Sequence, residues 1–177
     1  MRLLRLLPLI LLTGCGYHQV GSATHIPTGI HTLAVPIFAT RVQAFRTEID
    51  FTQAVVRELN TSTRYRILTA VPGTADNPVA NADATLKGTI LTEAVTPLTY
   101  DASSGQTSSY LITITASVTL TAHDGRILYR NEAFPWREQF QSTQDLSGFV
   151  QEDAAAVRRI SRDFAQALVS DMMESFR

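Results

Sequence analysis

Residues 110–121 read YLITITASVTLT, and this stretch decides the fold. Apolar side chains at the even positions alternate with side chains that are, after one leucine, all threonine or serine. A repeat of two places successive side chains on opposite faces of a β-strand. The stretch therefore predicts a long strand with one apolar face and one hydroxyl-rich face, and the apolar face needs a covering layer.

The sequence on both sides of this strand predicts an antiparallel meander. Residues 84–96 carry Leu86, Ile90 and Ala94 at positions expected to share one face, and Pro97 is expected to end that strand. Downstream, an Asp-Gly pair at 124–125 is typical of a tight turn into a strand over residues 127–140.

Two further short strands precede the meander. The first is predicted over residues 33–38, where Pro36 implies an edge position or an early end because proline cannot donate to a ladder. The second is predicted over residues 65–68, and a helix between the two would make them parallel. Residues 71–83 read as a loop because proline, glycine and asparagine recur there.

Two helices are expected to cover the apolar face. The first begins with Thr47 followed by Asp50, an acidic form of the capping box, and it ends near Asn60. Its apolar stripe consists of Ile49, Val55, Val56 and Leu59. The second follows a loop over residues 142–148, and its stripe consists of Val150, Ala154, Val157, Ile160, Phe164, Leu168 and Met172.

These elements together predict the fold class. Helices and strands that each bury one apolar face pack most simply as layers. We expect an α+β two-layer sandwich, with two helices packed on one face of a four- to five-stranded mixed, mainly antiparallel sheet.

The N-terminus has the features of an export signal over residues 1–14. Arg2 and Arg5 give a positive start, residues 6–12 are apolar, and two small residues follow. An apolar stretch this short cannot span a bilayer core of about 30 Å.

Cys15 follows the small residues directly, as in the bacterial lipobox, whose cysteine is lipidated and becomes the new N-terminus. More than one acyl chain gives a lasting membrane anchor. We expect a signal peptide at 1–14, a lipidated tether at 15–29 and one domain at 30–177. The alternative is an ordinary signal peptide with an accidental cysteine.

Composition excludes several classes of function. The formal net charge is −1 and no basic stripe suggests nucleic acid. Cys15 is the only cysteine, which excludes an intrachain disulfide and a thiolate metal cluster. The four histidines have no metal-ligand spacing, and no Gly-x-Ser-x-Gly motif is present. We expect no catalytic activity, no metal and no cofactor.

Four motifs in order resemble the LPS-assembly lipoprotein family (LptE). They are Cys15-Gly16-Tyr17-His18, the strand start ADATLKGTI at 82–90, Gly105-Gln106-Thr107 with Tyr110 before the alternating strand, and Glu152-Asp153-Ala154-Ala155. The resemblance covers nearly the whole chain after residue 14. It implies a non-enzymatic, periplasm-facing outer-membrane lipoprotein that plugs the LPS-assembly β-barrel and helps to insert lipopolysaccharide into the outer leaflet. Gly16 after the lipidated cysteine is compatible with outer-membrane sorting.

The resemblance also implies contact with lipopolysaccharide through basic side chains near the Gly-Gln-Thr loop and on the strand after the last hairpin. Residues 101–104 of this loop contain no basic residue. The strand offers Arg126 and Arg130, which a spacing of four should place on one face, with Arg137 on the other. The alternative is that Asp124 and Glu132 simply balance these arginines at a solvated surface.

The hydroxyl-rich face is the candidate barrel-facing surface. Its predicted members are Thr113, Thr115, Ser117 and Thr119. Ordinary solvation explains such a face as well.

A second function also stays open, that of a lipid-carrying or lipid-binding periplasmic lipoprotein of another envelope transport system. Such a protein would need an apolar pocket between sheet and helices.

Overall fold

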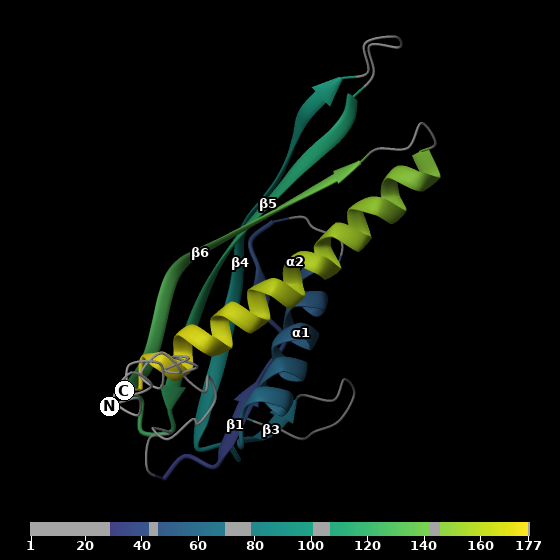
Figure 1. The fold of residues 1–177 in the computed structure, drawn as a ribbon. Coiled ribbons are helices and arrows are strands. Elements are labelled where there is room, and N and C mark those ends of the chain that lie inside the picture. Colours follow the sequence, from purple (N-terminus) through teal and green to yellow (C-terminus); the bar gives the residue numbers. More distant parts are fainter. Residues whose placement is uncertain (1–28, 43–45, 70–78, 101–106, 142–145, 177) are drawn as a thin grey trace, which may run out of the picture.

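The computed structural model describes residues 29–42, 46–69, 79–100, 107–141 and 146–176. Within them, two helices lie on one side of a six-stranded mixed sheet (Figure 1). The strands are β1 (Thr32–Val35), β2 (Ala39–Thr40), β3 (Arg66–Thr69), β4 (Ala84–Tyr100), β5 (Thr107–Ala122) and β6 (Ile127–Gln141). The helices are α1 (Thr47–Ser62) and α2 (Leu146–Glu174). The predicted α+β class is confirmed, and the strand count exceeds the expectation only through the two-residue β2.

The predicted meander of β4, β5 and β6 is confirmed. Both pairs of strands are antiparallel over most of their length. At the turn between β5 and β6, the amide of Gly125 donates to the carbonyl of Ala122 at 2.9 Å, and Gly125 adopts φ +88°. A positive φ costs glycine little, so Asp124-Gly125 closes the hairpin as the sequence indicates.

β1 lies inside the sheet, between β3 and β4 and parallel to both. The parallel crossover through α1 is confirmed. Of the two alternatives implied by Pro36, the edge position is wrong and the early end is confirmed. β1 ends at Val35, one residue before Pro36, so the proline lies outside the ladder and needs no donor there. The sheet follows the order β3-β1-β4-β5-β6, with β2 beside β4.

A carboxylate clamp joins the beginnings of β1 and β4. Asp83 Oδ2 accepts from the amides of His31 at 2.9 Å and Thr32 at 2.8 Å, and from the Thr32 hydroxyl at 2.8 Å. The Asp83 amide donates back to that hydroxyl at 2.9 Å. These hydrogen bonds, led by the His31 amide, hold the pKa of Asp83 down at about 2. Residues 70–78 of the predicted loop lie outside the described residues.

The expected capping box at the start of α1 is wrong. Arg46 is the N-cap residue, with φ 63°, and makes no side-chain cap hydrogen bond. Thr47 is the first helical residue and is buried, and its hydroxyl donates to Glu93 Oε2 on β4 at 3.0 Å. A bond to the sheet has replaced the local cap, which only the tertiary fold could reveal.

The core lies between the helices and the even-numbered face of β5. Phe164 of α2 is fully buried, and its ring centroid lies 4.9 Å from that of Phe51, 5.6 Å from Phe134 and 6.5 Å from Phe38. The described part of the α2 stripe is confirmed as buried: Val157, Ile160, Phe164, Leu168 and Met172. The side chains of Val150 and Ala154 lie outside the described residues. In α1, Val55 and Leu59 are buried and Ile49 and Val56 are half-buried.

β4 is longer than expected and changes phase along its length. A register shift between Ile90 and Thr92 makes Leu91 an extra residue, so Glu93 and Val95 pair with Ile114 and Ile112. Ala94 therefore lies on the face opposite to the one predicted, across from Thr113.

Pro97 does not end β4, which continues to Tyr100. Beyond Ile90, no described strand pairs with the outer edge of β4, so proline's missing N–H leaves no ladder bond unmade there. α2 begins at Leu146, so the last three residues of the loop predicted over 142–148 are helical. Residues 142–145 of that loop lie outside the described residues.

Candidate functional site

The outer face is the side of β4, β5 and β6 that points away from α1 and α2. Within the described residues, both helices pack on the opposite side of the sheet. The four predicted hydroxyl side chains lie together on this face and are each half-buried: Thr113, Thr115, Ser117 and Thr119. Their apolar neighbours Ile112, Ile114, Ala116 and Val118 are fully buried on the other side.

The hydroxyl surface extends onto β4, which the sequence reasoning missed. Thr89 pairs with Ser117, and Thr92 pairs with Thr115. A strict period of two cannot place both threonines on one face, because they are three residues apart. The extra residue Leu91 brings Thr92 onto the same face as Thr89. Small hydroxyl side chains of β4 and β5 therefore lie next to one another on the outer face, and we call this group the hydroxyl field.

Basic side chains border this field at both of its ends. Near the β5–β6 turn, Lys87, Thr119 and Arg130 form one row across three strands. Near the other end, Arg137 pairs with Thr113. Lys87, Arg130 and Arg137 are all exposed.

The expected arrangement of the β6 arginines is wrong. Arg126 precedes β6 and lies in the turn, and a register shift then separates the Thr121–Ile127 pair from the Leu120–Tyr129 pair. A second register shift lies between the Ala116–Phe134 and Val118–Asn131 pairs, where β6 has one extra residue. Arg130 and Arg137 are seven positions apart, and this extra residue places them on the same face of the sheet. Arg130 thus shares the outer face with Arg137 and not with Arg126.

Both candidate lipopolysaccharide contacts have acidic neighbours. Arg126 Nε lies 3.8 Å from Asp124 Oδ2, and Arg130 Nη1 lies 3.7 Å from Glu132 Oε1. These are the two carboxylates that the sequence suggested as balancing charges. The pairs are well exposed, so each adds little to stability.

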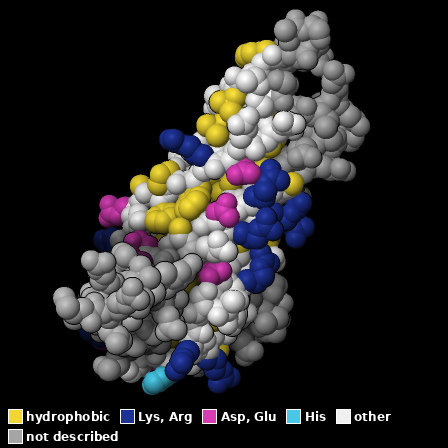
Figure 2. Space-filling view, in the orientation of Figure 1, with side chains coloured by type: hydrophobic (Ala, Val, Ile, Leu, Met, Phe, Trp, Pro, Cys, Tyr) yellow, Lys and Arg dark blue, Asp and Glu magenta, His cyan; other side chains and the backbone are white. Residues whose placement is uncertain are grey.

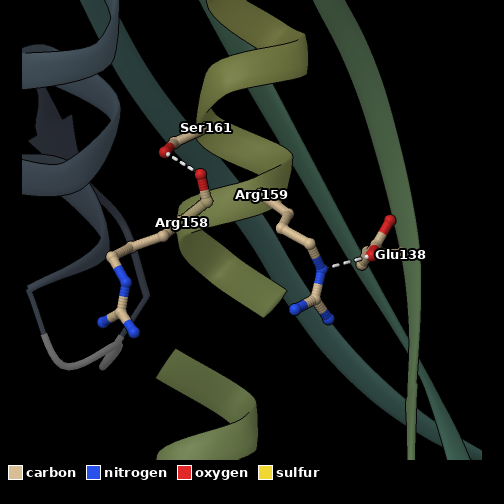
Figure 3. A network of polar contacts seen from close by, with 4 residues as sticks. All are labelled: Glu138, Arg158, Arg159 and Ser161. Carbon is tan, nitrogen blue, oxygen red and sulfur yellow. Dashed lines mark hydrogen bonds and ion pairs between the residues drawn. The ribbon is translucent and has the colours of Figure 1, made fainter. Parts of the chain in front are cut away.

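The remaining acidic side chains of the meander point toward the helices. Glu93 accepts from the Thr47 hydroxyl of α1, and Glu138 Oε1 accepts from Arg159 Nε of α2 at 2.7 Å. Figure 3 shows Arg159 directed at β6 while Arg158, its neighbour in sequence, points to the other side of α2, toward α1. Glu93 pairs with Ile114 and Glu138 with Ile112, both on the buried face of β5.

The helix side of the molecule carries charges of both signs. Arginine side chains gather where α1 and α2 lie side by side, with Asp and Glu side chains among them (Figure 2). On α2, the exposed Arg162 is followed directly by the exposed Asp163. The helix side thus carries both positive and negative side chains. The charged side chains on the outer face of β4, β5 and β6 are positive, apart from Glu132.

Groups with shifted pKa values lie away from the outer face. Burial raises the pKa of Tyr65 to about 12. Burial also raises the pKa of Tyr129, whose hydroxyl donates to Asp171 Oδ2 of α2 at 2.6 Å. Both shifts follow from burial of the two side chains in the core between the helices and the sheet.

Other kinds of site find no support in the described part of the chain. There, no three His, Cys, Asp or Glu side chains come together as a metal site. Neither α1 nor α2 has an apolar stretch long enough to cross a membrane. Cys15, His18 and His25 lie outside the described residues.

Comparison with known proteins gives one family and a shared fold. The family model described as LptE: Lipopolysaccharide-assembly matches residues 30–172. No curated protein matches the sequence. Lipoprotein B of Nitrosomonas europaea has a similar structure, with TM-score 0.53, 11% identity and 88% of each chain covered.

Two other solved structures have the same fold. A putative lipoprotein of Caulobacter crescentus has TM-score 0.52 at 9% identity, covering 78% of this chain and 88% of its own. A protein of Xanthomonas campestris has TM-score 0.51 at 15% identity, covering 88% and 93%. At these identities the likeness shows the fold alone.

Proposed function

The chain belongs to the LptE family of lipopolysaccharide-assembly proteins, and on that premise we propose that it is the plug and assembly partner of the LPS-assembly β-barrel. In this role it sits in the outer membrane, faces the periplasm and aids insertion of lipopolysaccharide into the outer leaflet. It acts by binding, without catalysis.

The observation that carries the proposal is the hydroxyl-rich outer face. A sheet that needed only solvation on this side would tolerate any polar side chain there, whereas this face repeats small hydroxyl side chains, mostly threonine, over β4 and β5. Such side chains lie close to the backbone and leave a level surface that another protein can approach. The family supplies the partner, and the outer face supplies the contact area.

The alternative is a lipid carrier, and the packing between the layers disfavours it. A carrier needs an apolar pocket between sheet and helices. Here large side chains fill that space, and each is at most 1% exposed: Phe51, Phe164, Ile112, Ile114, Ile160 and Leu168. The described core has the character of a scaffold.

The anchor is part of the same proposal. Residues 1–14 serve as the signal peptide, Cys15 carries the lipid, and residues 15–29 form the tether to a domain at 30–177. Lipid anchoring would keep the domain beside a membrane-embedded partner and so raise its effective concentration there.

Arg126 and Arg130 are the proposed contacts for lipopolysaccharide phosphates. Arginine's planar fork suits phosphate. Because Arg126 lies in the turn before β6 and Arg130 lies on the outer face, they would contact separate phosphates. Each would exchange an exposed carboxylate neighbour for the phosphate, at little cost.

Added charge on the outer face tests the plug role. Thr115→Glu with Thr119→Glu places two carboxylates there, which stay solvated in the free domain but lose their water in an interface. We expect a normal unfolding midpoint, loss of co-purification with the co-expressed barrel, and an outer membrane permeable to bulky antibiotics. Gln53→Glu with Gln166→Glu adds the same charge at exposed helix positions and should change nothing. Normal barrel recovery with the threonine variant would remove this face from the interface.

A further inference from the structure

Lys87 and Arg137 are exposed cations on the outer face without a carboxylate partner among the described residues. Lys87 lies opposite Thr119 and Arg137 lies opposite Thr113. The two threonines are six positions apart on an extended strand that rises about 3.3 Å per residue, so the cations lie about 20 Å apart along the sheet.

Charge is divided between the two sides of the meander. The acidic side chains Glu93 and Glu138 turn toward the helices and are hydrogen-bonded there. The outer face receives Lys87, Arg130 and Arg137, and its one acidic neighbour, Glu132, already lies beside Arg130. The outer face therefore has a net positive charge in a chain whose formal net charge is −1.

We propose that the outer face docks on a carboxylate-bearing protein surface, with Lys87 and Arg137 each meeting an acidic side chain of the partner. The inference rests on the proposed function and deepens it: the inner wall of the barrel is acidic where it meets this sheet. Opposite charges at the two ends of a polar field fix the register and orientation of the two proteins.

The geometry favours a protein over a lipid. Cations about 20 Å apart cannot converge on one phosphate. The field between them is formed mainly by Thr113, Thr115, Ser117 and Thr119, whose short hydroxyl side chains suit a polar protein surface better than an acyl chain. Separate carboxylates on a broad, level protein surface match this spacing and polarity.

The charge also disfavours a second copy of the chain as the occupant. Two outer faces packed on each other would bring positive side chains together, and like charges at an interface are unfavourable. The face requires a partner of opposite sign.

The single lysine makes the inference directly testable. Lys87 is the only lysine in the sequence. A zero-length carbodiimide reagent joins an amine to a carboxylate within contact distance, so we expect a cross-link from Lys87 to an Asp or Glu of the co-expressed barrel, located by peptide mass spectrometry. Lys87→Arg keeps the charge and removes the amine. It should lose this cross-link yet recover the barrel normally.

Charge reversal gives an independent measurement. Lys87→Glu with Arg137→Glu should reduce barrel recovery about tenfold or more near physiological salt. The wild-type complex should weaken as salt rises, because salt screens exposed charges. Arg158→Glu with Arg162→Glu makes the same reversal on the helix side, and we expect full recovery. Unchanged unfolding midpoints in both double variants show that the domain is intact.

The outcomes separate the inference from the proposed function. If the wild-type chain recovers no barrel, the proposed function is wrong and the inference with it. If the wild type recovers the barrel and the Lys87→Glu, Arg137→Glu variant does so equally, only the inference is wrong. Equal loss in both double variants, a cross-link to a second copy, or loss of lipopolysaccharide binding with barrel recovery intact would each overturn it too.

Discussion

Asp83 holds the starts of β1 and β4 together through a single carboxylate oxygen. Three donors, the amides of His31 and Thr32 and the Thr32 hydroxyl, favour the charged form and lower its pKa from 3.8 to about 2. A lowered pKa in the folded state contributes stability above the unfolded pKa, and this contribution is lost as pH falls through the folded pKa.

Asp83→Asn should therefore destabilise the domain in a pH-dependent way. The wild type should have the higher urea midpoint near pH 6, and the difference should shrink as pH falls below about 4 and be lost near pH 2. Urea titrations across this range measure it. Asp163→Asn removes an exposed carboxylate of α2 and serves as the control. A difference that stayed constant to the lowest pH would contradict the charged clamp.

Gly88 lets the Phe38 ring lie directly on β4. A Cβ at this position would stand 2.3 Å from two carbons of that ring, and Phe38 is only 2% exposed. Overpacking of a filled core typically costs about 1–3 kcal/mol, so Gly88→Ala should lower the midpoint of unfolding.

A double-mutant cycle identifies the clash. Phe38→Leu alone should destabilise, but in the Gly88→Ala background it should cost much less, because the smaller side chain leaves room for the new methyl group. Strictly additive effects would place the strain elsewhere.

Among the helices and strands, those with an uninterrupted repeat of apolar residues were predicted correctly from the sequence. The alternation over 110–121 was enough to give β5, its two faces and the need for a helical layer. The helical stripe from Val157 to Met172 likewise predicted the buried side of α2. Both signals are local, and each is reinforced by the core that the element helps to build.

The elements that were predicted wrongly all depend on neighbours far along the chain. The bulges at Leu91 and near Glu132 insert single residues, and each moves every later side chain to the other face. Pro97 is tolerated in β4 because no described strand pairs with the edge of β4 opposite to β5 at this position. Thr47 binds Glu93 and not its own helix terminus.

The same bulges explain why the site was only partly predicted. Four hydroxyl residues of β5 could be placed on one face because β5 alternates without interruption. Lys87, Thr89 and Thr92 join them only through the register between β4 and β5. Arg130 and Arg137 share that face only after the shift in β6.

Phe164 packs in the centre of the core between the helices and the sheet, and removing its ring should lower the free energy of unfolding. It is fully buried against Phe51 of α1, Phe134 of β6 and Phe38. Phe164→Ala should lower the free energy of unfolding by about 3–5 kcal/mol, a large part of the 5–15 kcal/mol of a usual domain. Gln166→Ala, at an exposed position two residues on, is the control in the same denaturant titration. An unchanged midpoint for Phe164→Ala would contradict the two-layer packing.

For the molecule as a whole, the proposed membrane attachment resides in the lipid on Cys15. Cys15→Ser, exported with an ordinary cleavable leader in cells lacking the barrel, should move to the soluble fraction while the domain stays folded. Acyl chains supply the lasting affinity, and neither described helix can span a bilayer. Fractionation of both forms measures it, and a serine variant that stayed with the membranes would show that another surface binds them.

The position of β1 decides how the whole molecule bears mechanical load. β1 is the described strand nearest the N-terminus, and it lies in the interior of the sheet, parallel to β3 and β4. A pull on the chain ahead of Gly29, directed along β1, strains its ladder bonds together in shear and does not peel them one at a time. The bonds of Asp83 to His31 and Thr32 lie where that force enters. With the proposed anchor at Cys15, a force from the membrane along this direction would therefore load the β1 ladder in shear and would not peel an edge strand from the sheet.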